Sequence, residues 1–105
     1  MLDKNRAVDP KKLRRQLFIN GQFVDAADGA TIEVSDPHDG SKLVDIAEAK
    51  AADVDKAVAA ARAAFPAWKK MDGADRSRLL YKLADALEAR FDEFTELEAL
   101  DTGHP

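Results

Sequence analysis

Residues 17–24 read LFINGQFV, in which two apolar triplets flank an Asn-Gly dipeptide. Asn20 and Gly21 both tolerate the positive φ angles that a type I′ turn requires at its two central positions. Residues 17–19 and 22–24 are therefore predicted to pair as the antiparallel strands of a β-hairpin.

The residues that follow continue the extended pattern. Residues 31–35, TIEVS, alternate polar and apolar side chains as a half-buried strand does. Residues 36–40, DPHDG, are typical of a turn, because proline fixes one φ angle and glycine frees another. The extended pattern then resumes at residues 42–46. Residues 17–47 are thus predicted to form a small antiparallel sheet of three or four short strands.

The period of the apolar residues changes after residue 49, where a helical stripe replaces the alternation. The stripe consists of Val54, Ala57, Val58, Ala61 and Phe65. This spacing predicts a helix over 51–65, with Pro66 ending it because the residue before a proline avoids helical angles. Asp53 lies in the first turn, where its charge complements the helix dipole.

A second helical pattern runs over residues 74–101. Its apolar positions are Leu80, Leu83, Ala84, Leu87, Phe91 and Phe94, followed by Leu97 and Leu100. Residues 74–101 form one helix or two, since Asp92 could serve as the N-cap of a separate short helix. Gly103, His104 and Pro105 are predicted to end it. The fold class is therefore α+β, with short antiparallel strands followed by two or three α-helices.

Composition narrows the classes of protein that fit. The chain has 105 residues, 16 Lys+Arg, 20 Asp+Glu and no cysteine, with a net charge of −4. This length suits one domain, and the absence of cysteine excludes disulfides and thiolate chemistry within the chain. We expect a reducing, cytoplasmic location. The net charge gives no reason to expect nucleic-acid binding, and no apolar stretch is long enough to cross a membrane.

The first sixteen residues differ in charge from the rest of the chain. Residues 1–16 hold six basic and two acidic side chains. They lack apolar periodicity, so we predict a flexible basic arm ahead of a folded region at 17–105.

Side chains that carry chemistry are sparse. His38 and His104 are far apart and have no partners at metal-ligand spacing. The acidic residues of 85–101 lie along a helical surface. We expect this surface either to be solvated or to meet a basic neighbour. The glycines form no phosphate-binding motif, and Ser35, Ser41 and Ser77 lack the glycines of a nucleophile elbow. Trp68 and Tyr81 are expected to be packing residues. The predicted catalytic, cofactor-binding and metal-binding residues are accordingly none.

The order of the segments resembles the beginning of the aldehyde dehydrogenase superfamily. The resemblance is carried by residues 17–25, by 31–37 with Gly40, by 52–65 with Trp68, by the Arg76, Arg78, Leu79, Leu80, Leu83, Ala84, Asp85, Leu87 and Glu88 pattern, and by 97–105. Many members place Ser or Thr where Lys50 stands, so Lys50 is expected to cost the first helix its side-chain N-cap, about 1 kcal/mol.

The resemblance implies an enzyme that oxidises an aldehyde to a carboxylic acid with NAD or NADP. The family's catalytic cysteine acts through a thiohemiacetal and a thioester, with a glutamate as general base. The resemblance places these residues downstream of the matching segment, so none is carried onto this chain. It also makes residues 17–105 the N-terminal part of an α/β Rossmann-like coenzyme-binding domain. The parent enzyme would have an aldehyde substrate and the remainder of its chain as partners, and would form a homo-oligomer.

Three hypotheses follow for this chain. In the first, it is an N-terminal fragment of a dehydrogenase, inactive alone and without a bound cofactor. In the second, it is a stand-alone interaction module derived from that family. In the third, its basic arm binds acidic polymers in a salt-dependent way.

Overall fold

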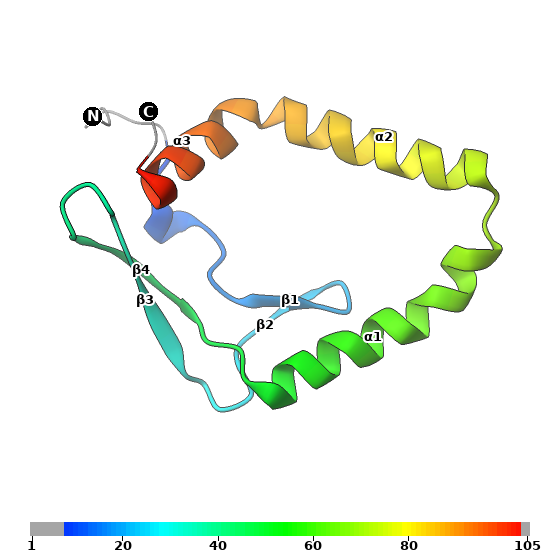
Figure 1. Cartoon of the computed structure of the whole chain (residues 1–105), viewed down its shortest axis with the longest axis horizontal. Coiled ribbons are helices and arrows are strands. Elements are labelled where there is room, and N and C mark those ends of the chain that lie inside the picture. Colours follow the sequence, from blue (N-terminus) through cyan, green and yellow to red (C-terminus); the bar gives the residue numbers. More distant parts are fainter. Residues whose placement is uncertain (1–7, 104–105) are drawn as a thin grey trace.

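A computed structural model of the chain describes residues 8–103. The elements follow one another around a ring (Figure 1). In chain order they are the 3-10 helix η1 (Pro10–Lys12), the strands β1 (Leu17–Ile19), β2 (Gln22–Val24), β3 (Thr31–Ser35) and β4 (Lys42–Ala47), and the helices α1 (Ala51–Lys70), α2 (Gly73–Ala89) and α3 (Phe91–Thr102). The predicted fold class, short antiparallel strands followed by helices, is confirmed.

The four strands form two separate hairpins rather than one sheet. β1 pairs with β2, with Leu17 opposite Val24, and β3 pairs with β4, with Thr31 opposite Ala47. Asn20 and Gly21 have φ angles of 54° and 74°, as the predicted hairpin turn requires. The prediction of a single sheet is wrong, because the turn at residues 26–29 directs β3 away from β2, and these two strands do not pair.

Helix α1 continues through Pro66 and ends at Lys70, so the predicted end at residue 65 is wrong. A proline within a helix removes one backbone hydrogen bond, here the bond to the Arg62 carbonyl, and strains the preceding turn. Residues 67–70 nevertheless complete another helical turn. Met71 has an extended conformation, with φ −66° and ψ 140°, and ends the helix.

Residues 74–101 belong to two helices, which decides between the two predicted alternatives. Arg90 separates α2 from α3 with φ −115° and ψ 27°. Asp92 lies in the first turn of α3 and is not its N-cap, so the predicted capping role is wrong. Gly103 ends α3 in the left-handed conformation. His104 and Pro105 lie outside the described residues.

The N-terminal segment has local structure where the sequence predicted none. Pro10–Lys12 form η1, and the Asp9 carboxylate accepts a hydrogen bond from the Lys11 N–H at 3.0 Å. Proline at the first helical position and aspartate at the N-cap both favour this turn. The prediction of a structureless arm is therefore wrong for these residues, and its first seven residues lie outside those described.

The chain buries little of itself. The radius of gyration is 17.1 Å, whereas a compact domain of this length has about 13 Å. The accessible surface is 8347 Å², whereas a compact protein of this mass exposes about 5,800 Å². Among the described residues, the buried apolar ones are Ala26, Ala99 and Leu100, and Leu100 is only 1% exposed. The helices therefore extend away from a very small core.

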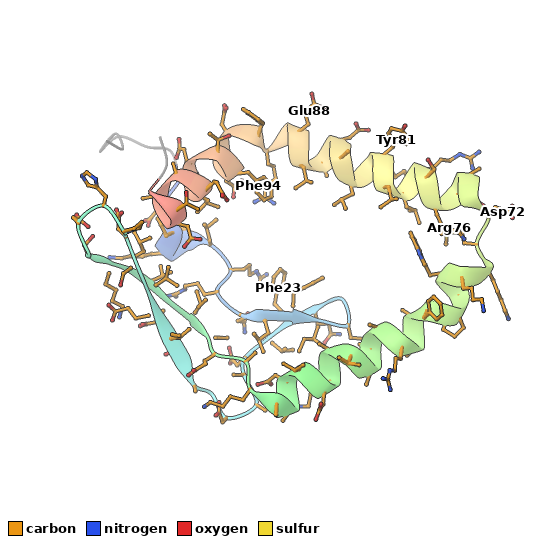
Figure 2. All side chains as sticks on the ribbon, in the orientation of Figure 1. Phe23, Asp72, Arg76, Tyr81, Glu88 and Phe94 are labelled. Atoms are coloured by element: carbon orange, nitrogen blue, oxygen red, sulfur yellow. The ribbon has the colours of Figure 1, made fainter. Side chains whose placement is uncertain are left out.

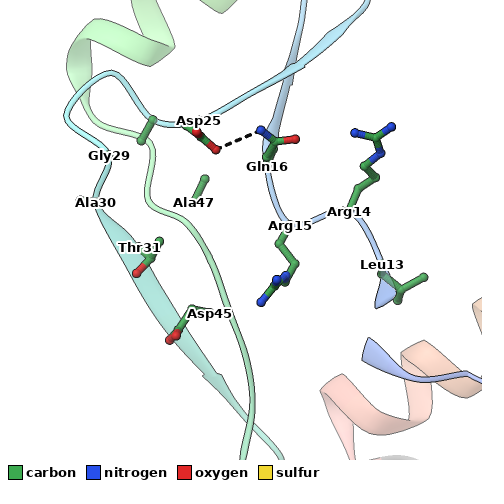
Figure 3. A pocket seen from close by; sticks show the side chains of 11 residues that line it. Leu13, Arg14, Arg15, Gln16, Asp25, Gly29, Ala30, Thr31, Asp45 and Ala47 are labelled. Atoms are coloured by element: carbon green, nitrogen blue, oxygen red, sulfur yellow. Dashed lines mark hydrogen bonds between the residues drawn. The ribbon is translucent and has the colours of Figure 1, made fainter. Parts of the chain in front are cut away.

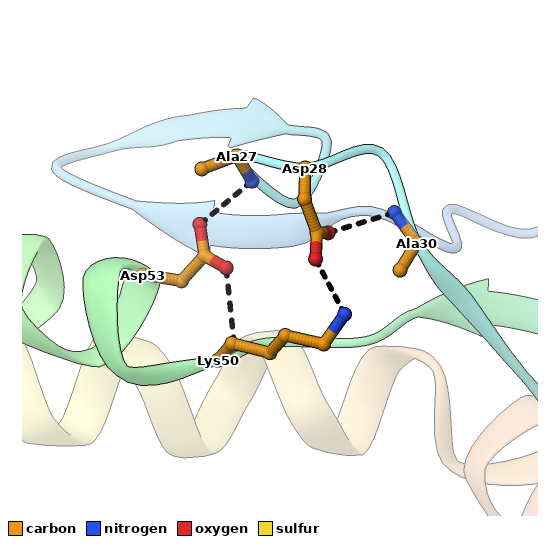
Figure 4. Close-up of polar contacts among 5 residues, drawn as sticks. All are labelled: Ala27, Asp28, Ala30, Lys50 and Asp53. Atoms are coloured by element: carbon orange, nitrogen blue, oxygen red, sulfur yellow. Dashed lines mark hydrogen bonds and ion pairs between the residues drawn. The ribbon is translucent and has the colours of Figure 1, made fainter.

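Asp53 connects α1 to the hairpins. Its side chain accepts hydrogen bonds from the Ala27 N–H at 2.9 Å and from the Lys50 N–H at 3.1 Å (Figure 4). Asp53 is only 4% exposed. Lys50 makes no side-chain cap, as expected, but the carboxylate of Asp53 satisfies the N–H of Lys50 from inside the helix. One carboxylate thus holds the first turn of α1 against the 25–30 loop.

We predict that Asp53→Ala loosens this junction. The substitution leaves two N–H groups without their acceptor, which costs about 1 kcal/mol or more, so the Ala27 amide should exchange with solvent at least roughly fivefold faster. Hydrogen–deuterium exchange followed by NMR measures this. Asp55→Ala is the matched control, because Asp55 is an exposed carboxylate near the start of the same helix. Equal exchange rates of the Ala27 amide in the two variants would contradict the role that we give to Asp53.

An ion pair lies beside this junction. The Lys50 ammonium pairs with the Asp28 carboxylate, which also accepts a hydrogen bond from the Ala30 N–H at 2.9 Å. The Lys50 hydrogen bond is the main reason, and the Ala30 N–H the second, that the pKa of Asp28 lies below its ordinary value. A lowered carboxyl pKa adds stability above the ordinary pKa, and that stability is lost as the pH falls through the lowered value.

Lys50→Met is therefore expected to raise the pKa of Asp28. The rise should stop short of the ordinary aspartate value, because the hydrogen bond from the Ala30 N–H remains. A carboxyl-carbon NMR titration of both proteins measures the midpoint directly. An unchanged midpoint would show that the ion pair is not formed in solution.

Candidate functional site

The largest functional feature is a set of exposed apolar side chains on the three helices, here called the apolar face. It consists of Val54, Val58 and Phe65 of α1, Leu80, Leu83 and Leu87 of α2, and Phe91 and Phe94 of α3. These eight side chains are between 44% and 64% exposed. They include most of the positions that the helical stripes marked in the sequence.

The apolar stripes of α1 and α2 do not cover one another. Figure 2 shows Phe23 and Phe94 directed toward the opening of the ring, while Tyr81 and Glu88 lie on the outer side of α2. Leu80, Leu83 and Leu87 follow one side of α2 at a spacing of three and four residues. Apolar surface on this scale is unusual on a soluble monomer and is typical of a macromolecular interface. The geometry therefore suits a protein partner.

An open cavity of about 490 Å³ lies between the N-terminal segment, the 25–30 loop and β4 (Figure 3). Its charged lining side chains are Arg14, Arg15, Asp25 and Asp45, two of each sign. Asp25 accepts a hydrogen bond from Nε2 of Gln16 at 3.0 Å. Among the side chains that line this cavity, the structure shows no hydrogen bond between a nucleophile and a general base.

The histidine predictions have separate outcomes. His38 is exposed in the β3–β4 turn, where its backbone N–H donates a hydrogen bond to the Asp36 carboxylate at 2.9 Å. His104 lies outside the described residues. Within residues 8–103, no three acidic or histidine side chains form a group suited to a metal ion.

The acidic side chains of α3 have structural partners. Glu93 forms an ion pair with Arg90 at 2.7 Å, and this hydrogen bond is the main reason that the pKa of Glu93 lies below its ordinary value. Glu96 accepts a hydrogen bond from the Val8 N–H at 3.0 Å. The structural roles of Asp53 and Glu96 were missed in the sequence, because each bonds to backbone that is distant along the chain.

The remaining candidates do not come together. Ser41 donates a hydrogen bond to Asp39 at 2.6 Å within the β3–β4 turn, and Ser35 and Ser77 are exposed elsewhere. Trp68 and Tyr81 were expected to pack, but they are 39% and 72% exposed. They add to the apolar surface that the helices leave uncovered.

No helix among residues 8–103 combines the length and the apolar content that a bilayer span needs.

We predict that the full chain binds a hydrophobic dye or self-associates through the apolar face. Replacing Phe65 and Leu83 together by lysine should lower dye fluorescence and light scattering, because charged groups resist desolvation. Lys56→Ala with Lys82→Ala is the control, since it changes exposed polar positions of the same two helices. Equal dye binding in both double variants would exclude the apolar face as the binding surface.

Comparison with known proteins gives a consistent result. The model of the aldehyde dehydrogenase family matches residues 23–105. A putative aldehyde dehydrogenase, DhaS of Bacillus subtilis, is 50% identical over 93 residues, which are 87% of this chain and 19% of DhaS. The human mitochondrial 10-formyltetrahydrofolate dehydrogenase is 50% identical over 94 residues, 88% of this chain and 10% of that protein.

Solved structures share the arrangement of the elements. PnpE, crystallised with nicotinamide adenine dinucleotide, superposes with a TM-score of 0.85 at 57% identity, over 89% of this chain and 19% of PnpE. Betaine aldehyde dehydrogenase from Staphylococcus aureus gives a TM-score of 0.83 at 27% identity, over 89% of this chain and 19% of that protein. The chain thus spans only about a tenth to a fifth of the relatives that it matches.

Proposed function

Because this chain belongs to the aldehyde dehydrogenase family, we propose that it is the N-terminal segment of an NAD(P)-dependent enzyme that oxidises an aldehyde to a carboxylic acid. The observation that carries this proposal is the apolar face, an interface without its other half, on a chain that matches about a fifth of DhaS. In this proposal the remainder of the dehydrogenase covers α1 and α2.

The chemistry is proposed to reside in that remainder. The chain has no cysteine, whereas the resemblance implies a cysteine nucleophile that forms a thioester. The role of this chain's own residues is then structural: Asp53 orients α1, and the buried Leu100 orients α3. The catalytic and metal-binding residues of this chain are proposed to be none.

We propose that residues 8–103 do not bind a dinucleotide. A pyrophosphate is bound by clustered backbone N–H groups in a glycine-rich turn that leads into a helix. Here Gly21, Gly29 and Gly40 lie in three separate turns, and Gly73 begins α2 without a second glycine beside it. We therefore propose that NAD, or NADP, binds to the parent enzyme outside this segment. The NAD complex of PnpE supports the choice of NAD.

Location and assembly complete the proposal. A cytoplasmic location is supported by the absence of cysteine, and relatives include both cytosolic and mitochondrial proteins.

The aldehyde substrate and the remaining dehydrogenase chain are the proposed partners, and a homo-oligomer is the proposed assembly. A stand-alone interaction module is the alternative, because the apolar face would serve a separate protein partner equally well.

Complementation tests the proposal. DhaS lacking the segment that this chain matches is expected to be inactive, and adding this chain should restore aldehyde-dependent NADH formation. The chain alone should show no turnover. The Phe65→Lys, Leu83→Lys variant should fail to complement, because a charged interface opposes docking, whereas Lys56→Ala with Lys82→Ala should succeed.

The outcomes separate the hypotheses. Turnover by this chain alone would overturn the fragment hypothesis. Failure to bind the truncated DhaS, together with cooperative unfolding of a monomeric chain, would favour the interaction module instead.

A further inference from the structure

We propose that residues 8–16, here called the clasp, close the ring by binding α3 on one side and the hairpins on the other. The clasp is a conformational device within the fold, and the proposal does not depend on the dehydrogenase assignment. Figure 1 shows this segment between α3 and β4, where the two ends of the ring meet.

The first side of the clasp contacts α3. The Val8 N–H donates a hydrogen bond to Oε2 of Glu96 at 3.0 Å, across 88 residues of sequence. Leu13 is half-buried and lines a cavity of about 350 Å³ together with Leu97 and Leu100 of α3 and with Val44 of β4. The clasp therefore adds to α3 a long-range hydrogen bond and an apolar side chain that lines the same cavity as Leu100, the most buried large side chain among the described residues.

The second side of the clasp contacts both hairpins. The Arg15 carbonyl accepts a hydrogen bond from the Ala47 N–H at the end of β4, at 2.8 Å. The Arg14 guanidinium lies 4.5 Å from the centre of the Phe23 ring, within the range of a cation–π contact. Gln16 donates to Asp25 at 3.0 Å. The clasp is thus fixed at three points to elements that do not form one sheet.

Charge complementarity supports the pairing with α3. The clasp contains Lys11, Lys12, Arg14 and Arg15 and one acid, Asp9, whereas α3 contains Asp92, Glu93, Glu96, Glu98 and Asp101 and no basic residue. Lys12 shares the lining of a cavity of about 300 Å³ with Asp92, Glu93 and Glu96. These opposite charges attract one another, and salt weakens the attraction by screening it. The acidic surface of α3 therefore lies beside a basic segment of the same chain.

The clasp controls the position of α3 because α3 has few other attachments. Its connection to α2 is the non-helical Arg90, and its buried Leu100 lines a cavity together with Val34 and Val44 of the β3–β4 hairpin. Release of the clasp would uncover Leu13 and Leu100 and free α3 to turn about Arg90. The ring would then open on the side opposite the α1–α2 corner.

Hydrogen–deuterium exchange of the full-length chain tests the clasp. Glu96→Ala and Leu13→Ala should each speed the exchange of α3 amides by roughly fivefold or more, because each removes one clasp contact. Amides of α1 should be unaffected. The matched controls are Glu88→Ala on the outer side of α2 and Leu79→Ala, which remove the same groups away from the clasp.

Salt provides a second measurement that requires no substitution. Raising the ionic strength to about 1 M shortens the Debye length to about 3 Å and should speed α3 exchange without changing α1. Three outcomes would overturn the proposal. The first is that α3 amides exchange at equal rates in the clasp variants and the control variants. The second is that the exchange of α1 and α3 amides is accelerated equally. The third is that α3 amides already exchange without protection in the unmodified chain.

Discussion

The arrangement of the chain depends on the burial of Leu100 of α3, which lies beside Leu13 and the β3–β4 hairpin. At 1% exposure, Leu100 is the most completely buried large side chain among the described residues. Burying a leucine contributes about 1.5–3 kcal/mol, which is small beside the conformational entropy of a hundred ordered residues. A single site of this kind sets the path of the chain but supplies only a small part of its stability.

The burial of Leu100 is small beside the conformational entropy, and this difference explains why the helices have apolar stripes in their sequences. α1 and α2 have the amphipathic patterns of core helices, but their apolar side chains meet solvent in this chain. A pattern of this kind is stable when a second surface completes it, since most helix stability in proteins comes from tertiary packing. The anchored features of the chain are therefore Asp53 at the start of α1 and the buried Leu100 of α3.

Local patterns were enough to predict the strands and the helical regions after residue 16, but not η1 or the contacts between elements. Asn20-Gly21 predicted the hairpin because both residues act within the turn itself, and the 3.6-residue stripes predicted the helices for the same reason. Pro66 was misread because proline weakens a helix without always ending it. Asp53 and Glu96 looked like surface acids, since their backbone partners, Ala27 and Val8, lie 26 and 88 residues away. The expectation that this chain holds no catalytic residue rests on residue types, whereas the apolar face became visible only once the stripes were placed in space.

The ring also has a consequence for the order of folding. Most elements contact sequence neighbours, so hairpins and helices can form early and independently. The Val8–Glu96 hydrogen bond instead joins residues that are 88 positions apart. Bringing such distant segments together costs roughly 4 kcal/mol of loop entropy, from the logarithmic dependence on loop length. Closure should consequently be the last and slowest step of folding, and during synthesis it must wait until α3 has left the ribosome.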